Sequence, residues 1–302
     1  HVLSRRQRQM CIRDSLDGDP ENRGSVPLKE ENVARLEEYM RAFNQPISTV
    51  TLEQGEYANT GFTQWGASGL AAAWAEENTR ESLFAAFRRK ETFATTGPRI
   101  SVRFFGGYNL SSIDLNSESL VSEAYSKGVT MGADLLNNDD QIPEFIVWAL
   151  RDMNSAPLQR IQIIKGWIDM NSGRPKEKVF DVACSDGLEP DPITNRCPDN
   201  GARVNINDCS ITSNVGSSEL KTVWKDPEFK VDDKAFYYVR VLENPTCRWS
   251  TWDAIKSGFK PREGLHETIQ ERAWSSPIWY IPKQSEVEVI PLGGTIQLRN
   301  ID

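Results

Sequence analysis

The chain has 302 residues, of which 38% are hydrophobic and 26% charged, so it is long enough for two ordinary domains and too polar for a protein embedded in a membrane. Acidic residues outnumber basic ones by 43 to 35, and the formal net charge of −8 argues against a nucleic-acid backbone or an anionic membrane surface as the main partner. Two histidines are too few for a metallohydrolase centre built from several imidazoles, so we expect this chain alone to hold no metal cofactor.

The start of the chain does not resemble part of a fold. Residues 5–14 can be back-translated, codon by codon, into the end of a sequencing-library adapter, and such segments are set aside before fold reasoning. We therefore interpret residues 1–15 as an adapter-derived artefact and expect the natural chain to begin near Leu16, with its true N-terminus lost. The alternative is a basic arm that binds nucleic acid.

Two segments precede the main β pattern. Residues 16–60 are polar and interrupted by prolines, which predicts an insertion or loop with one helix over about residues 29–43. In residues 61–98, a short apolar run over 69–75 precedes a helix expected over about 79–90, with Asn78 and Glu81 as its capping box. A strand, a turn and a capped helix form a βα unit. Because no parallel unit follows, we expect the terminal strand-helix unit of a larger α/β barrel.

From residue 99 the pattern changes to alternating strands. They are expected over residues 100–105, 144–149, 158–168, 178–183, 235–242 and 274–280. Long, turn-rich connections predict an antiparallel, β-sandwich-like domain over residues 99–282. A short helix over 251–257 is expected inside it, with Ser250 and Asp253 as a capping box, Trp252 and Ile255 facing inward, and Gly258 at its end. Residues 283–302 are interpreted as a variable tail. The expected fold class is therefore α+β.

Four cysteines lie outside the adapter segment. No Cys-x-x-Cys spacing occurs, and three of the four lie in a stretch rich in Pro, Asp, Asn and Gly that would gain from covalent cross-links. We predict two disulfides and favour one of the three possible pairings, while free thiols or a metal knot remain alternatives. The favoured pairs are Cys184 with Cys197 and Cys209 with Cys247. Disulfides place the protein in the periplasm or outside the cell, and no run reaches the roughly 18 apolar residues of a membrane span.

Two carboxylates are the best-placed catalytic candidates. Glu76 and Glu77 follow the predicted strand, and the C-terminal ends of barrel strands form the rim at which such folds keep their active sites. The alternative is that both charges merely stabilise the positive end of the following helix.

Other chemistry-bearing residues have simpler interpretations. His266 stands in a polar connection, where a lone histidine is expected to be a surface residue rather than a ligand or base. Four tryptophans could form a stacking platform for a sugar or an aromatic ligand, but clustered aromatics in a sandwich are usually core. These are Trp249, Trp252, Trp274 and Trp279.

Several longer strings resemble the C-terminal half of the domain-of-unknown-function 3604 family. They cover residues 74–81 (Trp-Ala-Glu-Glu-Asn-Thr-Arg-Glu), 92–100, 102–107, 158–166, 183–187 and 268–280, and the resemblance spans about residues 61–282. The family is similar to the PHP (polymerase and histidinol phosphatase) metal-dependent hydrolases, whose distorted α/β barrel binds divalent ions through His and Asp ligands and hydrolyses phosphoester-type bonds. The resemblance thus implies a PHP-like barrel followed by an appended β domain.

The family's metal motifs are missing. Its His-x-His motif and its late Asp-x-His motif have no counterpart in residues 16–302, so no metal ligand is assigned to any residue. We expect the C-terminal fragment of a PHP-like phosphoesterase that is inactive alone. A divalent metal (manganese, zinc or iron) and a small-molecule or ester substrate would belong to the parent protein. The alternative is a non-catalytic binding or structural module of a secreted or periplasmic protein. The upstream gene sequence would distinguish the two.

Overall fold

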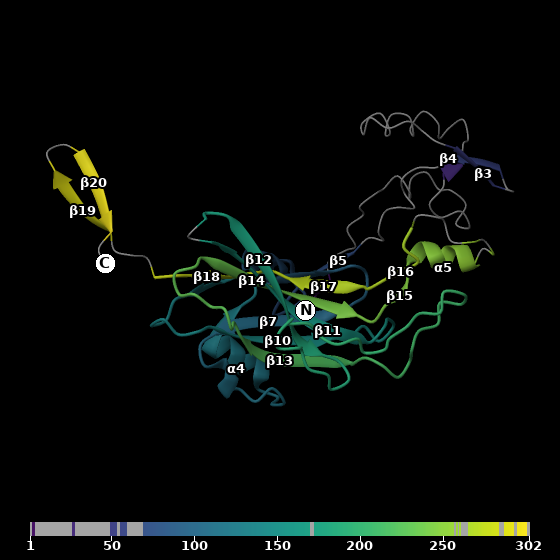
Figure 1. Ribbon diagram of the computed structural model, residues 1–302, viewed down its shortest axis with the longest axis horizontal. Helices are drawn as coiled ribbons and strands as arrows, with labels where there is room; N and C mark the ends of the chain where they lie inside the picture. Colours follow the sequence, from purple (N-terminus) through teal and green to yellow (C-terminus); the bar gives the residue numbers. More distant parts are fainter. Residues whose placement is uncertain are drawn as a thin grey trace.

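The computed structural model describes residues 69–169, 172–256, 258, 260 and 265–283, together with the backbone of six further strands (Figure 1). The expected helix over residues 29–43 and most of the adapter segment lie outside the described residues. In the described part of the chain, no helix is long and apolar enough to cross a lipid bilayer. The six further strands are β1 (Val2–Leu3), β2 (Val26–Pro27), β3 (Thr49–Leu52), β4 (Gly55–Ala58), β19 (Val287–Leu292) and β20 (Thr295–Asn300).

The larger of two main sheets is almost entirely antiparallel. Its strands follow the order β1-β5-β6-β17-β14-β11-β12, and β18 joins it by pairing with both β14 and β9. Only the β18–β9 pair is parallel among the pairs assigned in this sheet. The described strands are β5 (Leu70–Ala73), β6 (Thr92–Thr95), β9 (Asp134–Leu136), β11 (Leu158–Ile168), β12 (Pro175–Cys184), β14 (Ala235–Glu243), β17 (Arg272–Ser275) and β18 (Ile278–Ile281).

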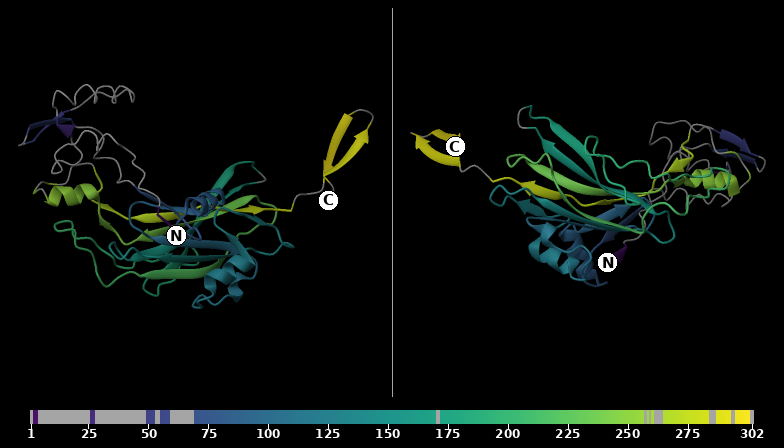
Figure 2. Two further views of the ribbon diagram at one scale, coloured as in Figure 1. Left: turned by 180° about the vertical axis from the view of Figure 1, so that it is seen from behind. Right: turned by 60° about the horizontal axis from the view of Figure 1, so that its bottom comes forward.

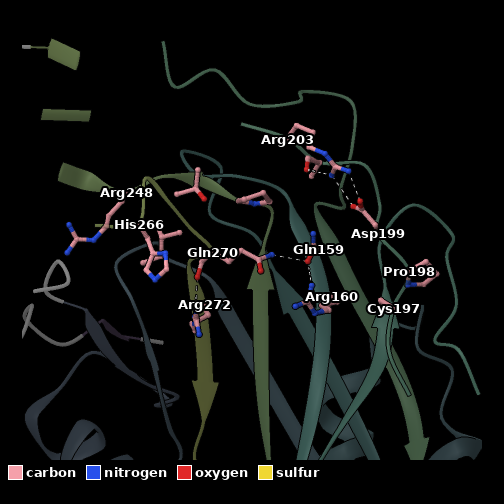
Figure 3. A pocket seen from close by; sticks show the side chains of 14 residues that line it. Gln159, Arg160, Cys197, Pro198, Asp199, Arg203, Arg248, His266, Gln270 and Arg272 are labelled. Atoms are coloured by element: carbon pink, nitrogen blue, oxygen red, sulfur yellow. Dashed lines mark hydrogen bonds and ion pairs between the residues drawn. The ribbon is translucent and has the colours of Figure 1, made fainter. Parts of the chain in front are cut away.

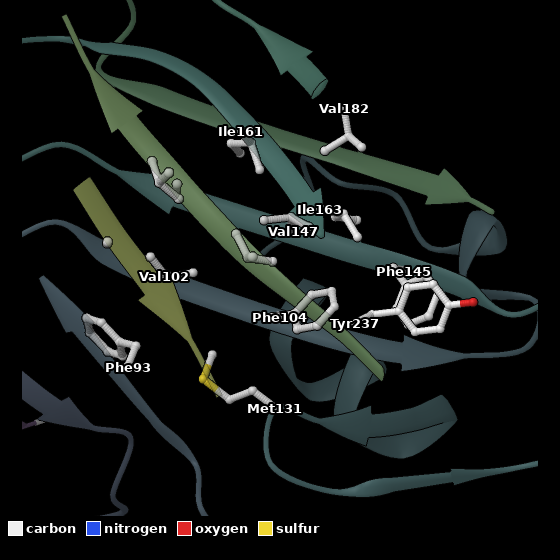
Figure 4. Close-up of a cluster of buried hydrophobic side chains, with 14 of the residues drawn as sticks. Phe93, Val102, Phe104, Met131, Phe145, Val147, Ile161, Ile163, Val182 and Tyr237 are labelled. Carbon is white, nitrogen blue, oxygen red and sulfur yellow. The ribbon is translucent and has the colours of Figure 1, made fainter. Parts of the chain in front are cut away.

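The smaller sheet packs face to face against the larger one and closes the main core. Its order is β13-β10-β7-β8, formed by β7 (Ser101–Gly107), β8 (Gly128–Thr130), β10 (Glu144–Leu150) and β13 (Glu219–Lys225). Phe104 and Phe145 from this sheet meet Ile161, Ile163 and Tyr237 from the other, and all five side chains are fully buried (Figure 4). The two layers therefore form a β-sandwich, in which alternate residues of each strand point inward.

A second, smaller core lies on the other face of the small sheet. Helix α4 (Leu120–Lys127) and the short 3-10 helix η3 (Leu110–Ser112) cover that face, where Phe105 and Ile146 contact Leu110, Leu120 and Ala124. Figure 2 shows α4 beside the smaller sheet, away from the larger one. Because residues 104–107 of β7 and 144–147 of β10 are buried on both faces, these stretches do not show the alternation of a strand with one exposed face.

The expected fold class is wrong in its α/β part. Strands β5 and β6 flank helix α3 (Arg80–Arg88), but they pair antiparallel with Ala73 opposite Thr92, whereas a βα barrel unit requires parallel strands. The backbone N–H of Trp74 donates to Glu91 O at 3.0 Å, so the helix begins and ends at the same end of the two strands. Strand β6 also pairs with β17, which places this segment in the larger sheet of the sandwich. No closed barrel is found among the described residues.

The expected strands after residue 99 are confirmed, with one interruption. Strand β11 covers residues 158–168 as predicted, while the strand expected over 274–280 is divided into β17 and β18 at Ser276 and Pro277. Proline has no N–H to donate, so it interrupts the ladder. Strands β8, β9 and β13 and helix α4 were not predicted.

Both capping predictions are wrong, by one residue at α3 and by two residues at α5. The N-cap of α3 is Thr79 rather than Asn78, because the Thr79 side chain accepts the N–H of Ser82 at 3.3 Å. Helix α5 (Trp249–Lys256) contains Ser250 within its first turn, and the carbonyl of Arg248 accepts the first helical N–H bonds instead. Gly258 follows α5 with a φ of 72°, in agreement with its expected role at the helix end.

Candidate functional site

The two predicted catalytic carboxylates lie in the turn before α3. Glu76 is 69% exposed and accepts hydrogen bonds from Ser82 Oγ at 2.9 Å and from Arg89 Nη2 at 3.0 Å. A backbone hydrogen bond, the Ser82 hydroxyl and the Arg89 charge lower its pKa. The Glu77 carboxylate accepts a hydrogen bond from Thr79 Oγ1 at 3.4 Å, and its backbone N–H donates to Ser82 Oγ. Because β5 is not a barrel strand, the rim argument no longer supports these residues, and their catalytic role stays a prediction.

The cysteine prediction is confirmed in both pairs. One disulfide joins Cys184, at the end of β12, to Cys197 in the following loop. The other joins Cys209 to Cys247 in β15 (Thr246–Cys247), which pairs with β16 (Thr268–Ile269). The bonds therefore attach the long loop after β12 to the larger sheet at one point and to the two-stranded β15–β16 sheet at another.

These cross-linked segments enclose an open groove of about 800 Å³ at one end of the larger sheet (Figure 3). Its floor is formed where β11 begins and β17 begins. One wall is the loop after β12, and the other is the segment around β15 and β16. The lining residues are Gln159, Arg160, Cys197, Pro198, Asp199, Ala202, Arg203, Pro245, Arg248, His266, Thr268, Ile269, Gln270 and Arg272. We call this feature the arginine groove.

Amide side chains connect the strands on the floor of the arginine groove. Gln270 Nε2 donates to Gln159 Oε1 at 2.9 Å and to the carbonyl of Glu243 at 3.0 Å. Gln159 Oε1 also accepts a hydrogen bond from Arg160 Nη1. This network orients the guanidinium of Arg160 at the floor.

In the loop wall, the charges of Asp199 and Arg203 are paired with each other. Arg203 Nη1 and Nη2 lie 3.1 and 2.6 Å from the two carboxylate oxygens of Asp199, which is a bidentate pair. Hydrogen bonds from Arg203 and from the N–H of Gly201 lower the pKa of Asp199 to about 2. Asp199 is thus fully ionised near neutral pH, and its charge is matched by that of Arg203.

The opposite wall contributes Arg248 and His266. Arg248 Nη1 donates to Ser250 Oγ at 2.6 Å, and its guanidinium lies 5.1 Å from the ring centroid of Trp249. His266 is exposed, which confirms its interpretation as a surface residue, but it also lines the arginine groove.

The four tryptophans belong to neither hydrophobic core. Trp252 and Trp279 are 39% and 43% exposed, so the core interpretation and the inward orientation of Trp252 are wrong. Trp249 and Trp274 are half-buried. Several of the rings contact cations instead: Lys256 Nζ lies 5.3 Å from the Trp252 centroid, and the Arg272 guanidinium lies 5.9 Å from that of Trp274.

Sequence reasoning missed the groove, although one signal was present. Polar residues alternate with apolar ones in the strands predicted over 158–168 and 235–242, and the polar set includes Arg160, Gln162 and Arg240. Such alternation marks one face of a strand, and arginines on adjacent outward positions could have suggested a cationic patch. Arg203, Arg248 and His266 lie outside helices and strands, in segments far apart in the sequence, and no local pattern predicts that they come together.

The residues described by the structure do not fit a metal centre. No group of three or more His, Cys, Asp or Glu side chains comes together among them. No metal ligand is therefore assigned in this part of the chain.

Comparison with known proteins gives one match. No curated protein and no solved structure matches the chain. A family model described as "Protein of unknown function (DUF3604)" matches residues 28–282. Since that match covers most of the 302 residues, the chain belongs to the DUF3604 family.

Proposed function

We propose that this chain is the non-catalytic β part of a PHP-like metal-dependent hydrolase of the phosphoester type, and that it has no hydrolase activity alone. The family match over residues 28–282 carries this proposal, because the family's resemblance to PHP hydrolases supplies the reaction class. A two-metal centre needs roughly six ligands. Only one of the two histidines in the chain, His266, lies outside the adapter segment. The metal ligands of the parent would therefore come from a segment upstream of this sequence.

The proposal includes a compartment and an origin for the first residues. Two disulfides are consistent with a periplasmic or extracellular protein, since cytosolic reductants keep most thiols reduced. We infer that residues 1–15 derive from an adapter. Amplification of the gene from its source DNA tests both points: an upstream reading frame with a signal peptide and a His-x-His motif should replace the adapter codons. A natural start codon directly before residue 1 would contradict the inference.

The inactivity of the chain can be measured directly. The purified 302-residue protein, supplied with manganese or zinc, is assayed with an aryl phosphodiester, and we expect no turnover that a chelator abolishes. Turnover that is lost with chelator and persists through further purification would refute the proposal.

A second candidate function is a binding module without chemistry in the parent. The arginine groove favours it, because a cationic concave surface in an acidic protein is suited to recognition whether or not the parent is an enzyme. The recovered upstream sequence distinguishes the two: a full set of His and Asp ligands supports the hydrolase, and a degenerate set supports the module.

A further inference from the structure

The charges around the arginine groove are not balanced. Among the described residues that line it are four arginines and one acidic residue, Asp199, which is already paired with Arg203. Arg272 forms no ion pair with any described carboxylate; its Nε donates to the carbonyl of Gln270 at 3.1 Å. The groove is therefore locally positive, although the whole chain has a net charge of −8.

Arg160 at the floor is the most constrained of these cations. Its side chain is 25% exposed, and its buried Nε forms no hydrogen bond, although Asp181 Oδ2 lies 3.7 Å away. Burial lowers the pKa of its guanidinium and Asp181 raises it, while the charges of Arg240, Arg196 and Arg272 lower it further. Arg160 therefore lies among three other guanidinium groups that repel it.

Asp181, the carboxylate that acts on Arg160, is shared among several donors. The buried Asp181 accepts hydrogen bonds from Gln162 Nε2 at 2.6 Å, from Arg196 Nη1 at 3.3 Å and from the N–H of Cys197 at 2.8 Å. Gln162 in turn accepts a hydrogen bond from Arg240 Nε at 2.6 Å. This chain of contacts fixes the side chains beneath the groove. Arg272 takes no part in it: burial raises the pKa of the neighbouring Glu271 and the charge of Arg272 lowers it, but the two form no ion pair.

We propose that the arginine groove binds the dianion of a phosphate monoester, with Arg160 and Arg272 as its principal ligands. A guanidinium presents its N–H donors in a planar fork that matches phosphate oxygens, and two such groups match two negative charges. Pro198, Pro245 and Ile269 add apolar surface for the organic group, and about 800 Å³ accommodates a small ester. The choice of an ester rests on the proposed function. Free phosphate has the same recognition chemistry.

The test is a calorimetric titration of the 302-residue chain with inorganic phosphate, phenyl phosphate and benzoate. We expect saturable binding of both phosphates, and about tenfold to a hundredfold weaker binding in Arg160→Gln and Arg272→Gln, because hydrogen bonds to charged groups are the strong ones. Tighter binding of phenyl phosphate than of phosphate identifies an ester as the ligand, and equal binding identifies the phosphate ion.

The matched control is Arg88→Gln, which removes one exposed arginine from α3, outside the groove. It should bind both phosphates as the wild type does, and thermal melting verifies that each variant is folded. The proposal is overturned if neither phosphate saturates, if benzoate binds as tightly as phenyl phosphate, or if Arg88→Gln weakens binding as much as the groove variants do. Turnover by the reconstructed parent is measured separately. If the groove binds phosphate but the parent shows no turnover, the proposed hydrolase is refuted and the phosphate site stands. If the parent shows turnover but the groove binds no phosphate, the hydrolase stands and the phosphate site is refuted.

Discussion

A buried ion pair in the sandwich gives the sharpest stability prediction. Lys165 Nζ lies 2.5 Å from Asp226 Oδ2, and the two side chains are 2% and 0% exposed. Nζ also donates to the carbonyl of Glu228 at 2.9 Å, and the hydroxyl of Tyr237 donates to Asp226 at 2.8 Å. Every polar group of this cluster thus has a partner, which is the condition under which buried charges are tolerated.

Removing only the negative charge should be costly. Asp226→Asn leaves the ammonium of Lys165 buried without a counter-charge, and breaking such a pair costs about 3–5 kcal/mol. That is a large part of the roughly 5–15 kcal/mol by which a domain is stable. The double variant Lys165→Met with Asp226→Asn removes both charges, while the amide oxygen of the introduced asparagine still accepts the hydrogen bond from Tyr237. It should be more stable than Asp226→Asn alone by about 2 kcal/mol or more.

Urea unfolding at pH 7, followed by tryptophan fluorescence and by circular dichroism, measures both differences. Coincident transitions from the two probes establish that a single free energy of unfolding applies. A cost below about 1 kcal/mol for Asp226→Asn, or a double variant less stable than the single one, would show that the pair is not electrostatically isolated from solvent.

Three further predictions concern a cap, a carboxyl group and a disulfide. Thr79→Ala should cost about 1 kcal/mol, since Thr79 caps α3, and Asn78→Ala should cost much less; equal losses in urea unfolding would contradict the assigned cap. Burial raises the pKa of Glu243 to about 8 from its usual 4.5, so the stabilisation by its protonated form is complete below about pH 4.5 and is lost as the pH rises through 8. Glu243→Gln should flatten the dependence of the unfolding free energy on pH between about 5 and 9, and an unchanged slope would refute this origin. Replacing Cys209 and Cys247 by alanine releases a cross-link with a sequence separation of 38 and should cost about 4 kcal/mol by loop entropy, which calorimetric melting checks; an unchanged melting temperature would contradict it.

The strands could be predicted from the sequence because their signal is local. Residues 158–168 combine β-branched and apolar residues over a length typical of a strand in a large sheet, and β11 covers that range. The disulfides could also be predicted, because three cysteines fall in turn-rich sequence, where cross-links stabilise an irregular backbone.

The direction in which strands pair could not be predicted in the same way. A short apolar run followed by a capped helix occurs both in a parallel crossover and in an antiparallel pair that carries a helix in its connection. The choice depends on contacts outside the segment. Trp74 donates its Nε1–H to the carbonyl of Val102 at 2.7 Å, and the guanidinium of Arg103 lies 3.6 Å from the centroid of its ring. These contacts hold the connection at one end of β5 and β6, and no pattern within residues 69–95 reveals them.

The pairing of β6 with β17 has a consequence for the order of events during synthesis. Thr92 and Ser276, whose hydroxyl oxygens lie 2.9 Å apart, are separated by 184 residues. At roughly 5–20 residues per second, a ribosome needs about 10–40 s to make the chain between them. For that interval, the edge of β6 that later binds β17 has no partner strand, and an unpaired edge is a template for association with other chains. A chain released before Arg272 is translated would keep this edge, so early termination should produce aggregation rather than a smaller folded sandwich.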